Sequence, residues 1–568
     1  MLRPRRNSLN ILAVGFVVTC FLVLSVAVPG SAQNYVNDRM LLNAEKDPNN
    51  WLLYGRDYAS TRHSPLNQIN INNVKKLVPK WVFQFGYLDG QDSEAIANNG
   101  VLYITSSWNH VFALDARTGN LIWRYDHPLP EDLTKHLCCD VVNRGVAPYR
   151  DKVYFATLDE HVVALDAKTG KVVWDKTLGD YTYGETFTLM PMALRGKIIV
   201  GTAGAEYGIR GWIAALDADS GELVWKTYTV PGPGEPGNET WGGESWKYGG
   251  GSAWITGSYD PDLNILYWPV GNPGPDLDRH VRPGDNLYTN STLALDPDTG
   301  KIKFYFQYTP NDPYDFDGVN EVILADVGDK KVWLHADRNG YFYSIDRTNG
   351  KFIYGVPLSE INWAKGLDEN GRPIMNWPEK DVHYDKVTKN ISPSLEGGKE
   401  WHPMAYNPHK GVAYVPTFQL TMDLQAMRQE WKRGELYLAA KVLEYHPGYG
   451  SLIAIEAATG KTKWVWNNKS PMTSGVLSTD GGLVFAGNPE GEFMAFNDET
   501  GELLWKFQTG SGIVGNPTTF SVDGKQYVAV PSGIGGWMGW ATLGQGGAPW
   551  LKNVSKGGAL FVFGLFEE

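Results

Sequence analysis

One pattern of apolar and polar positions recurs along the chain. Each copy starts with a short apolar stretch that usually ends in Asp, continues through a polar turn that ends in Gly, and closes on an aromatic ring. Gly supplies a positive φ and the Asp side chain can bond the turn amides, so each copy predicts a β-hairpin. The copies are Ala113–Trp123, Ala164–Trp174, Ala215–Trp225, Ala294–Phe304, Ser344–Tyr354, Ala454–Trp464 and Ala495–Trp505.

The spacing of these hairpins predicts a closed ring of sheets. Most copies begin about 40–50 residues apart, a period typical of radially repeated four-stranded sheets. An eighth unit is indicated by Trp81, which lies a similar distance before Trp123 and lacks its own turn motif. The last strand, Gly558–Leu565, is expected to pair with this N-terminal strand and so hide the sheet edges. We therefore predict an all-β fold, an eight-bladed β-propeller, in which the repeated Trp rings pack between blades.

The N-terminus reads as an export signal. Three Arg residues stand within the first six positions, an apolar run extends from Ile11 to Val28, and small residues follow as far as Ala32. This arrangement predicts a signal peptide over 1–32, cleaved after Ala32, and a propeller over 33–568 in the periplasm. The alternative is an uncleaved anchor, because the apolar run is nearly long enough to span a bilayer.

Charge and cysteine content narrow the function classes. The formal net charge of −12 argues against nucleic acid as a partner, since phosphates need a basic face. The chain has three cysteines, one of them in the signal segment and the other two adjacent at Cys138 and Cys139. No Cys-x-x-Cys-His motif occurs, so covalent c-type haem is excluded.

The two adjacent cysteines lie in the segment Leu137–Ala147, and a disulfide between them would stabilise the fold very little. A disulfide between neighbours constrains almost no chain. Two interpretations remain from the residues alone: a pair of buried thiols, or a rigid ring that serves as a stacking surface.

Acidic and amide residues in loops suggest a cation site. Glu206 lies in a Gly-rich loop, Asn272 lies in a turn, and Asp315 and Asp317 stand two apart. In an extended chain residues i and i+2 face the same way, and two such carboxylates repel unless a cation lies between them. Asp-x-Asp by itself is weak evidence, because solvated turns often contain it.

These features together resemble a known family. The hairpin repeats, Leu137–Ala147 and the motifs GGGSAW, GNPGP, NDPYDFDG and HADRNG resemble the alcohol and methanol dehydrogenases that depend on pyrroloquinoline quinone (PQQ). The resemblance runs from Trp51 to the final strand.

The resemblance implies a role for each matching residue. The Cys138–Cys139 pair is expected to be a disulfide on one face of PQQ, with Trp254 on the other. Asp315 is expected to be the catalytic base and, with Glu206, Asn272 and Asp317, to hold the metal. The remaining cofactor-binding positions are Glu94, Arg144, Thr188, Gly204, Ala205, Ser252, Arg338, Glu400 and Trp537.

Asp317 bears on the identity of the metal. The resemblance implies Ala at this position in calcium-dependent members and Asp in lanthanide-dependent ones, so a lanthanide is expected and calcium is the alternative. Ala203, Glu400 and Thr473 depart from residues common in the family. Asp276 stands where a Trp lines the substrate cavity in other members, which weakens an expectation of strict methanol specificity.

The implied reaction is the oxidation of a primary alcohol to an aldehyde. Asp315 would take the hydroxyl proton while a hydride passes to the metal-polarised quinone, and the electrons would leave to a periplasmic cytochrome c. A homodimer is one expected oligomeric state. The alternatives are a methanol dehydrogenase with a narrow substrate range, a glucose-type quinoprotein, and a non-enzymatic propeller scaffold.

Overall fold

The computed structural model describes residues 35–540 and 552–566. The predicted signal peptide, residues 1–32, therefore lies outside the described residues. Within those residues, none of the helices has the length and apolar character needed to cross a membrane.

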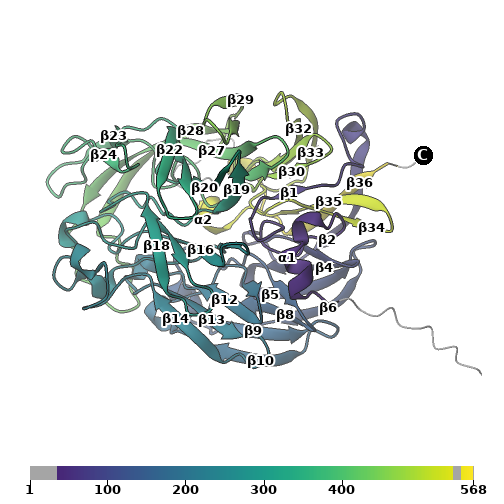
Figure 1. The fold of residues 1–568 in the computed structure, drawn as a ribbon, viewed down its shortest axis with the longest axis horizontal. Helices are drawn as coiled ribbons and strands as arrows, with labels where there is room; N and C mark the ends of the chain where they lie inside the picture. Colours follow the sequence, from purple (N-terminus) through teal and green to yellow (C-terminus); the bar gives the residue numbers. More distant parts are fainter. Residues whose placement is uncertain (1–34, 541–551, 567–568) are drawn as a thin grey trace, which may run out of the picture. The chain divides into compact units, whose positions relative to one another are not determined.

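Eight sheets of four strands or more follow one another in chain order around a ring, as Figure 1 shows. We number these blades from 1 to 8. The first four blades comprise β3 (Ile96–Asn98), β4 (Val101–Ser106), β5 (His110–Asp115) and β6 (Leu121–Asp126); β7 (Ala147–Tyr149), β8 (Lys152–Ala156), β9 (His161–Asp166) and β10 (Val172–Thr177); β11 (Met192–Leu194), β12 (Lys197–Gly201), β13 (Trp212–Asp217) and β14 (Leu223–Tyr228); β15 (Ser258–Asp260), β16 (Ile265–Val270), β17 (Ser291–Leu295) and β18 (Ile302–Gln307).

The other four blades complete the ring. They comprise β19 (Ile323–Val327), β20 (Lys330–Ala336), β21 (Tyr341–Asp346) and β22 (Phe352–Pro357); β26 (Ala405–Asn407), β27 (Val412–Ala426), β28 (Ala440–Glu456) and β29 (Thr462–Asn468); β30 (Leu477–Thr479), β31 (Leu483–Gly487), β32 (Glu492–Asn497) and β33 (Leu503–Gln508); β34 (Thr518–Val522), β35 (Lys525–Ser532), β36 (Ala559–Leu565) and β2 (Leu77–Gln84).

The remaining strands and helices are short. β1 (His63–Ser64) pairs with β30, β25 (Thr388–Ile391) pairs with β27, and β23 (Ala364–Leu367) pairs with β24 (Pro373–Met375). The helices are α1 (Asp38–Leu42), α2 (Gly536–Trp540) and the single-turn 3-10 segments η1 (Ala44–Lys46), η2 (Val74–Lys76), η3 (Ser107–Asn109), η4 (Leu133–His136), η5 (Tyr181–Tyr183), η6 (Ala205–Tyr207), η7 (Asn238–Thr240), η8 (Ser245–Tyr248) and η9 (Arg279–Val281).

The repeated turn joins the third and fourth strands of a blade. In blade 3, Asp217 Oδ1 accepts hydrogen bonds from the amides of Asp219 and Ser220 at 3.1 and 2.9 Å. Gly221 closes the turn with a φ of +71° and donates its amide to the Asp217 carbonyl. The turn therefore satisfies its own backbone groups, as the sequence pattern predicts.

Most of the repeated rings pack on the turn of the next blade. Trp123 in β6 donates its indole N–H to the Ala167 carbonyl at 3.0 Å. A Cβ on Gly170, in the same turn, would lie only 2.6 Å from the Trp123 ring, so only Gly allows this contact. The same arrangement of ring on glycine recurs at Trp81 on Gly119, Trp174 on Gly221, Trp225 on Gly300, Phe304 on Gly350, Tyr354 on Gly460 and Trp464 on Gly501.

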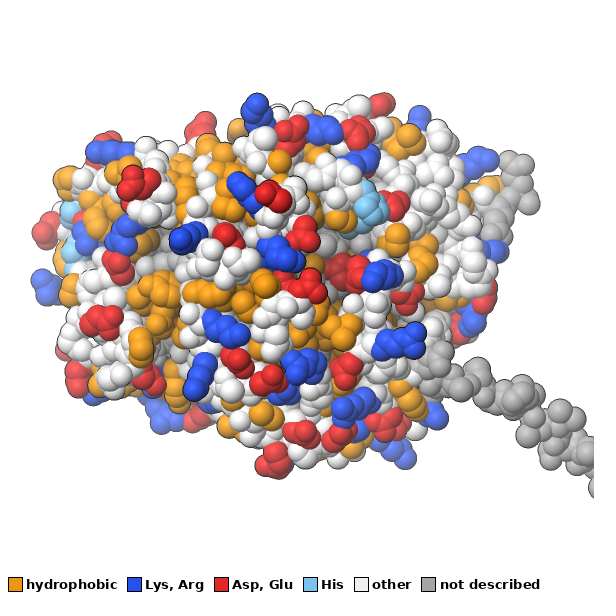
Figure 2. Space-filling view, viewed as in Figure 1, with side chains coloured by type: hydrophobic (Ala, Val, Ile, Leu, Met, Phe, Trp, Pro, Cys, Tyr) orange, Lys and Arg blue, Asp and Glu red, His pale blue; other side chains and the backbone are white. Residues whose placement is uncertain are grey.

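The ring closes as predicted. β2 pairs antiparallel with β36, with Trp81 opposite Val562 and Val82 opposite Phe561. The N-terminal and C-terminal strands thus share blade 8, and their pairing removes two sheet edges from solvent. On the face of the molecule shown in Figure 2, acidic and basic side chains are interspersed.

Blade topology separates two kinds of loop. Because the strands of a blade are antiparallel, the turns between strands three and four leave one edge of the ring. The connections between strands two and three, and those from one blade to the next, leave the opposite edge. The long connections of the chain, such as those between β16 and β17 and between β27 and β28, belong to this second set, and a cavity lies among them.

Candidate active site

A cavity of about 580 Å³ is lined by loops from most of the blades. Most of the residues singled out from the sequence line it, although they are widely spaced along the chain. These are Cys138, Cys139, Arg144, Thr188, Gly204, Glu206, Trp254, Asp315, Asp317, Arg338, Glu400 and Trp537.

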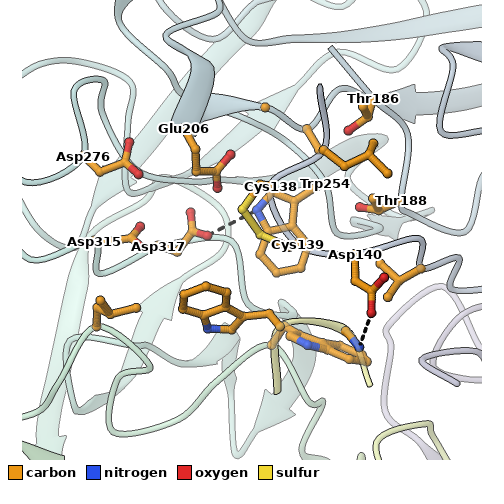
Figure 3. A pocket seen from close by; sticks show the side chains of 18 of the residues that line it. Cys138, Cys139, Asp140, Thr186, Thr188, Glu206, Trp254, Asp276, Asp315 and Asp317 are labelled. Atoms are coloured by element: carbon orange, nitrogen blue, oxygen red, sulfur yellow. Dashed lines mark hydrogen bonds between the residues drawn. A yellow bond between two sulfur atoms is a disulfide. The ribbon is translucent and has the colours of Figure 1, made fainter. Parts of the chain in front are cut away.

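A disulfide between neighbouring residues, Cys138 and Cys139, lies at the cavity wall. The next residue, Asp140, accepts a hydrogen bond from the Gly536 amide at 3.1 Å, which ties this loop to the start of α2. Both sulfur atoms and a carboxylate oxygen of Glu206 lie within 4.8 Å of one another. The disulfide is therefore next to the acidic part of the cavity (Figure 3).

In the part of the cavity next to the disulfide, an arginine packs against two tryptophan rings. The guanidinium carbon of Arg144 lies 4.6 Å from the Trp254 ring centre and 4.3 Å from that of Trp401. Arg144 donates from Nη1 to the Thr188 carbonyl at 3.2 Å, while its buried Nε has no hydrogen-bond partner. An unpartnered buried donor on a cation suits an anionic group of a planar ligand.

Four carboxylates gather on one side of the cavity. Figure 3 shows Glu206, Asp276, Asp315 and Asp317 together, with the disulfide and Trp254 beside them. Burial raises the pKa of Glu206 to about 7, and the neighbouring Asp317 carboxylate adds to this shift. Burial also raises the pKa of Asp315 well above its usual range. Such mutual repulsion is relieved when a cation binds between the groups.

The loop that carries Asp315 is held by a different aspartate. Asp312 accepts hydrogen bonds from the amides of Tyr314 and Phe316 at 2.8 and 2.7 Å. Asp315 itself has a φ of +63°, in the left-handed region that L-residues rarely adopt. The extended backbone assumed from the sequence is therefore wrong, yet both Asp315 and Asp317 line the cavity.

Asp317 connects three parts of the site. Its Oδ1 accepts from the Asn272 amide at 2.8 Å, and its Oδ2 accepts from Trp254 Nε1 at 3.2 Å and from Arg338 Nη1 at 3.1 Å. A Cβ on Gly271 would lie 2.0 Å from Asp317 Oδ1, so a side chain at that position would displace the Asp317 carboxylate. These hydrogen bonds join Asp317 to other loops of the site rather than to its own turn.

Arg338 is the cation nearest to this acidic group. Its Nη2 lies 3.0 Å from Glu400, and its Nη1 lies 4.0 Å from Asp315. Burial opposes its charge, but the surrounding carboxylates, Glu400 foremost, raise the pKa of Arg338 above its usual range. The positive charge of one arginine thus lies close to three carboxylates.

Comparison with known proteins identifies the family. The model of the glucose, ethanol and alcohol dehydrogenase β-propeller domain that binds PQQ matches residues 51–378 and 445–528. The chain belongs to the PQQ-dependent alcohol dehydrogenase family. It is therefore a quinoprotein alcohol dehydrogenase.

Individual relatives match over nearly their whole length. The chain is 42% identical to the quinoprotein alcohol dehydrogenase PedH of Pseudomonas putida, over 100% of this chain and 98% of that protein. It is 39% identical to the lanthanide-dependent methanol dehydrogenase of Methylacidiphilum fumariolicum, over 92% of this chain and 94% of that protein. A solved europium-containing methanol dehydrogenase superposes with a TM-score of 0.89 at 38% identity, over 93% of this chain and 100% of that one.

The cavity of this quinoprotein fits PQQ, a planar tricarboxylate. The disulfide and the Trp254 ring offer flat surfaces, and Arg144 offers an unpartnered cationic donor. Ser252 and Asn272 do not line the cavity, but both are fully buried and have an oxygen without a hydrogen-bond partner. Carboxylate and amide oxygens are the ligands that hard cations take, so the acidic side fits a metal as well.

Besides Ser252, two of the predicted cofactor-binding residues do not line the cavity. Glu94 is buried, forms an ion pair with Arg62, and accepts hydrogen bonds from Trp51 Nε1 at 2.7 Å and the Gly55 amide at 3.1 Å. These contacts hold the N-terminal segment, so we correct the assignment of Glu94 to cofactor binding. Ala205 lies in η6 and is fully buried behind Gly204, which does line the cavity.

Asp92 occupies the place that the sequence analysis gave to Glu94. It lines the cavity, its Oδ2 lies 3.8 Å from Arg144 Nη2, and its Oδ1 has no hydrogen-bond partner. Burial raises its pKa to about 7. The two acids stand two residues apart, so the sequence could have suggested either one.

Sequence reasoning also missed the long hairpin of β27 and β28. Leu436 and Leu438, in the connection between these strands, line the cavity. The Tyr437 amide donates to the Glu206 carbonyl at 2.6 Å, and the Leu277 amide donates to the Leu438 carbonyl at 3.1 Å. The available signal was the longest gap between repeats, which contains this hairpin.

The positions that depart from the family pattern have different surroundings. Ala203 and Glu400 line the cavity. Thr473 does not, and its hydroxyl donates to the Ile513 carbonyl at 2.9 Å. Asp276 is 1% exposed and lies in the acidic cluster, not at the surface.

Proposed function

We propose that this protein oxidises primary alcohols to aldehydes in the periplasm, with PQQ and a lanthanide ion. The observation that carries the proposal is the convergence of Asp315 with the acidic cluster, Arg338, the disulfide and Trp254 on a single cavity. PQQ held there would supply the hydride acceptor for the reaction, and a bound metal would supply Lewis-acid polarisation.

The chain's own groups position the reactants. Arg144 and Asp92, with Thr188, border the end of the cavity where an anionic and hydrogen-bonding edge of PQQ would be held. The Cys138–Cys139 ring and Trp254 would restrict the cofactor to one plane. Glu206, Asn272, Asp315 and Asp317 would provide oxygen ligands for the ion.

Asp315 is the group best placed to remove the hydroxyl proton. It lies in a loop fixed by Asp312, it faces the cavity, and its Oδ1 has no hydrogen-bond partner. General-base catalysis requires such an acceptor within reach of the alcohol. Burial raises the pKa of Asp315, and the neighbouring Arg338 opposes this shift by favouring the ionised form.

A lanthanide is favoured over calcium by charge. Glu206, Asp315 and Asp317 supply three carboxylates, and a trivalent ion neutralises them more completely than a divalent one. Relatives named as lanthanide-dependent and europium-containing methanol dehydrogenases support this choice.

The cavity wall favours alcohols longer than methanol. Leu277, Leu436, Leu438 and Val442 form an apolar lining close to Asp276. Burial of a longer alkyl chain against these side chains contributes about 0.8 kcal/mol per methylene group. We expect kcat/KM for ethanol, 1-butanol or longer primary alcohols to equal or exceed that for methanol, and a steep preference for methanol would support the narrower methanol dehydrogenase instead.

A separate cytochrome c is the proposed electron acceptor. The sequence has no Cys-x-x-Cys-His motif, and Cys138 and Cys139 are joined to each other. A homodimer stays a prediction, to be checked by light scattering of the purified protein.

Reconstitution tests the proposed function directly. The metal-free protein is combined with PQQ and either La³⁺ or Ca²⁺, and alcohol-dependent reduction of a dye is measured across a series from methanol to 1-hexanol. We expect activity only when PQQ and a metal are both present, and a higher rate with La³⁺. Activity without PQQ would overturn the proposal, and activity with Ca²⁺ but not with La³⁺ would overturn the lanthanide assignment.

A further inference from the structure

Asp276 is a buried carboxylate without an ion-pair partner. It follows the turn after β16, in the connection to β17, and its side chain is 1% exposed. Its Oδ1 has no hydrogen-bond partner, and no cationic side chain in the described part of the chain forms an ion pair with it. Figure 3 shows the carboxylate turned toward the group formed by Glu206, Asp315 and Asp317.

The nearest arginine fixes the backbone of this loop rather than the carboxylate. Arg282 is fully buried and donates to the carbonyl oxygens of Pro275 at 3.0 Å and Asp276 at 3.2 Å. It also donates to the carbonyl of Asp312, in the loop that positions Asp315. Arg282 therefore joins the two loops, and the Asp276 side chain is directed into the cavity as a consequence.

The charges of the cluster do not balance. Four carboxylates have two guanidinium groups nearby: that of Arg338, which is also 3.0 Å from Glu400, and that of Arg282, whose hydrogen bonds go to carbonyl and amide oxygens. Asn272 Oδ1, buried in the same region, is a further oxygen without a partner. An unbalanced group of buried oxygens is a site for a cation of high charge.

We propose that Asp276 is a fourth carboxylate of the metal site and that its charge increases the preference for a trivalent over a divalent ion. The inference rests on the proposed function, because it presumes a metal among Glu206, Asn272, Asp315 and Asp317. It assigns to the metal a residue that the sequence analysis considered only as a determinant of substrate size.

Metal binding itself provides the test. The full chain, stripped of metal and supplied with PQQ, is titrated with Tb³⁺, whose luminescence is sensitised by nearby tryptophan, and with Ca²⁺ as competitor. The Coulomb energy scales with the charge of the ion, so the logarithm of the loss in Asp276→Asn should be about 1.5 times larger for the trivalent ion. A roughly tenfold loss of Ca²⁺ affinity would thus accompany about a thirtyfold loss for Tb³⁺.

Asp278→Asn is the matched control. Asp278 lies two residues away and is equally buried, but it does not line the cavity. Its carboxylate accepts hydrogen bonds from the His280 amide and the Tyr384 hydroxyl. The control should change both affinities by less than about twofold, since its charge is farther from the ion. Thermal unfolding adds a second readout: metal-free Asp276→Asn should be at least as stable as the parent, while its stabilisation by Tb³⁺ should be smaller.

The outcomes separate this inference from the proposed function. If Asp276→Asn binds both ions as the parent does, or loses both equally, Asp276 does not select the metal charge and the inference is overturned. If the parent binds PQQ but neither Tb³⁺ nor Ca²⁺, the metal assignment of the proposed function fails first.

Discussion

The two edges of the propeller use aspartate in opposite ways. At the turn edge, Asp217 receives hydrogen bonds from amides of its own turn, and these bonds lower its pKa. At the cavity edge, Asp315 is buried with an unpartnered oxygen, and burial raises its pKa. The comparison teaches that carboxylates which build the fold are satisfied locally, whereas those which serve the reaction are left for a ligand to satisfy.

Asp315→Asn should give the largest effect on function with little effect on the fold. Loss of a general base lowers the rate by about 10²–10⁴-fold. The melting temperature of the metal-free protein should stay the same or rise, because one repelling charge is removed. Steady-state kinetics and thermal unfolding measure the two, and activity within tenfold of the parent would exclude Asp315 as the base.

Replacing both Cys138 and Cys139 by Ser should also separate function from stability. We expect turnover to fall on the order of 10- to 100-fold, equivalent to about 1.4–2.7 kcal/mol. The free energy of unfolding should change by less than about 1 kcal/mol, since a ring between neighbours constrains almost no chain. A large fall in melting temperature with normal turnover per bound PQQ would make the disulfide structural.

Gly170→Ala, at the turn edge, should lower stability and leave activity unchanged. The new Cβ would meet the Trp123 ring at 2.6 Å and would sit on a residue with a φ of +68°. We expect a loss of about 1–3 kcal/mol in unfolding free energy from overpacking and strain. Because the turn lies on the edge opposite the cavity, kcat per bound PQQ should be unchanged, and a changed kcat would contradict the separation of the two edges.

Asp217→Ala should give the smallest effect, and one that depends on pH. The change removes hydrogen bonds to a charged group within the turn and should lower stability by about 0.5–1.5 kcal/mol at pH 7. The folded-state pKa of Asp217 is lowered, so its stabilisation is present above the unfolded value of about 3.9 and is lost as pH falls below it. Denaturant unfolding at pH 7 and near pH 3 should therefore show a smaller difference between variant and parent at the lower pH.

Much of the fold could be predicted because its rules are local. The turn motif places Asp and Gly a fixed distance apart, and the following ring packs on the next copy of the same turn, as Trp123 does on Gly170. Period and repetition therefore predict both the blades and their order, and the pairing of β2 with β36 follows from the need to close the ring.

The candidate site was predictable only where a motif was itself unusual. The adjacent cysteines and the Asp315–Asp317 pair have an unusual spacing in the sequence, and they do line the cavity. The choice between Glu94 and Asp92 could not be made, because it depends on which acid meets Arg62 and which meets Arg144. Those arginines are far away along the chain from the acids they contact.

By itself, the sequence determined the repeating hairpins, the ring that they form and the residue types available for chemistry. Each of these follows from contacts within a turn or between successive copies of one motif. Only the tertiary structure decided that Asp276 turns into the acidic cluster, that Arg282 holds its loop by backbone carbonyls, and that the β27–β28 hairpin covers Glu206. The physical reason is that loops at the cavity edge acquire their conformation from neighbouring blades, so the sequence of one loop does not reveal which groups it will meet.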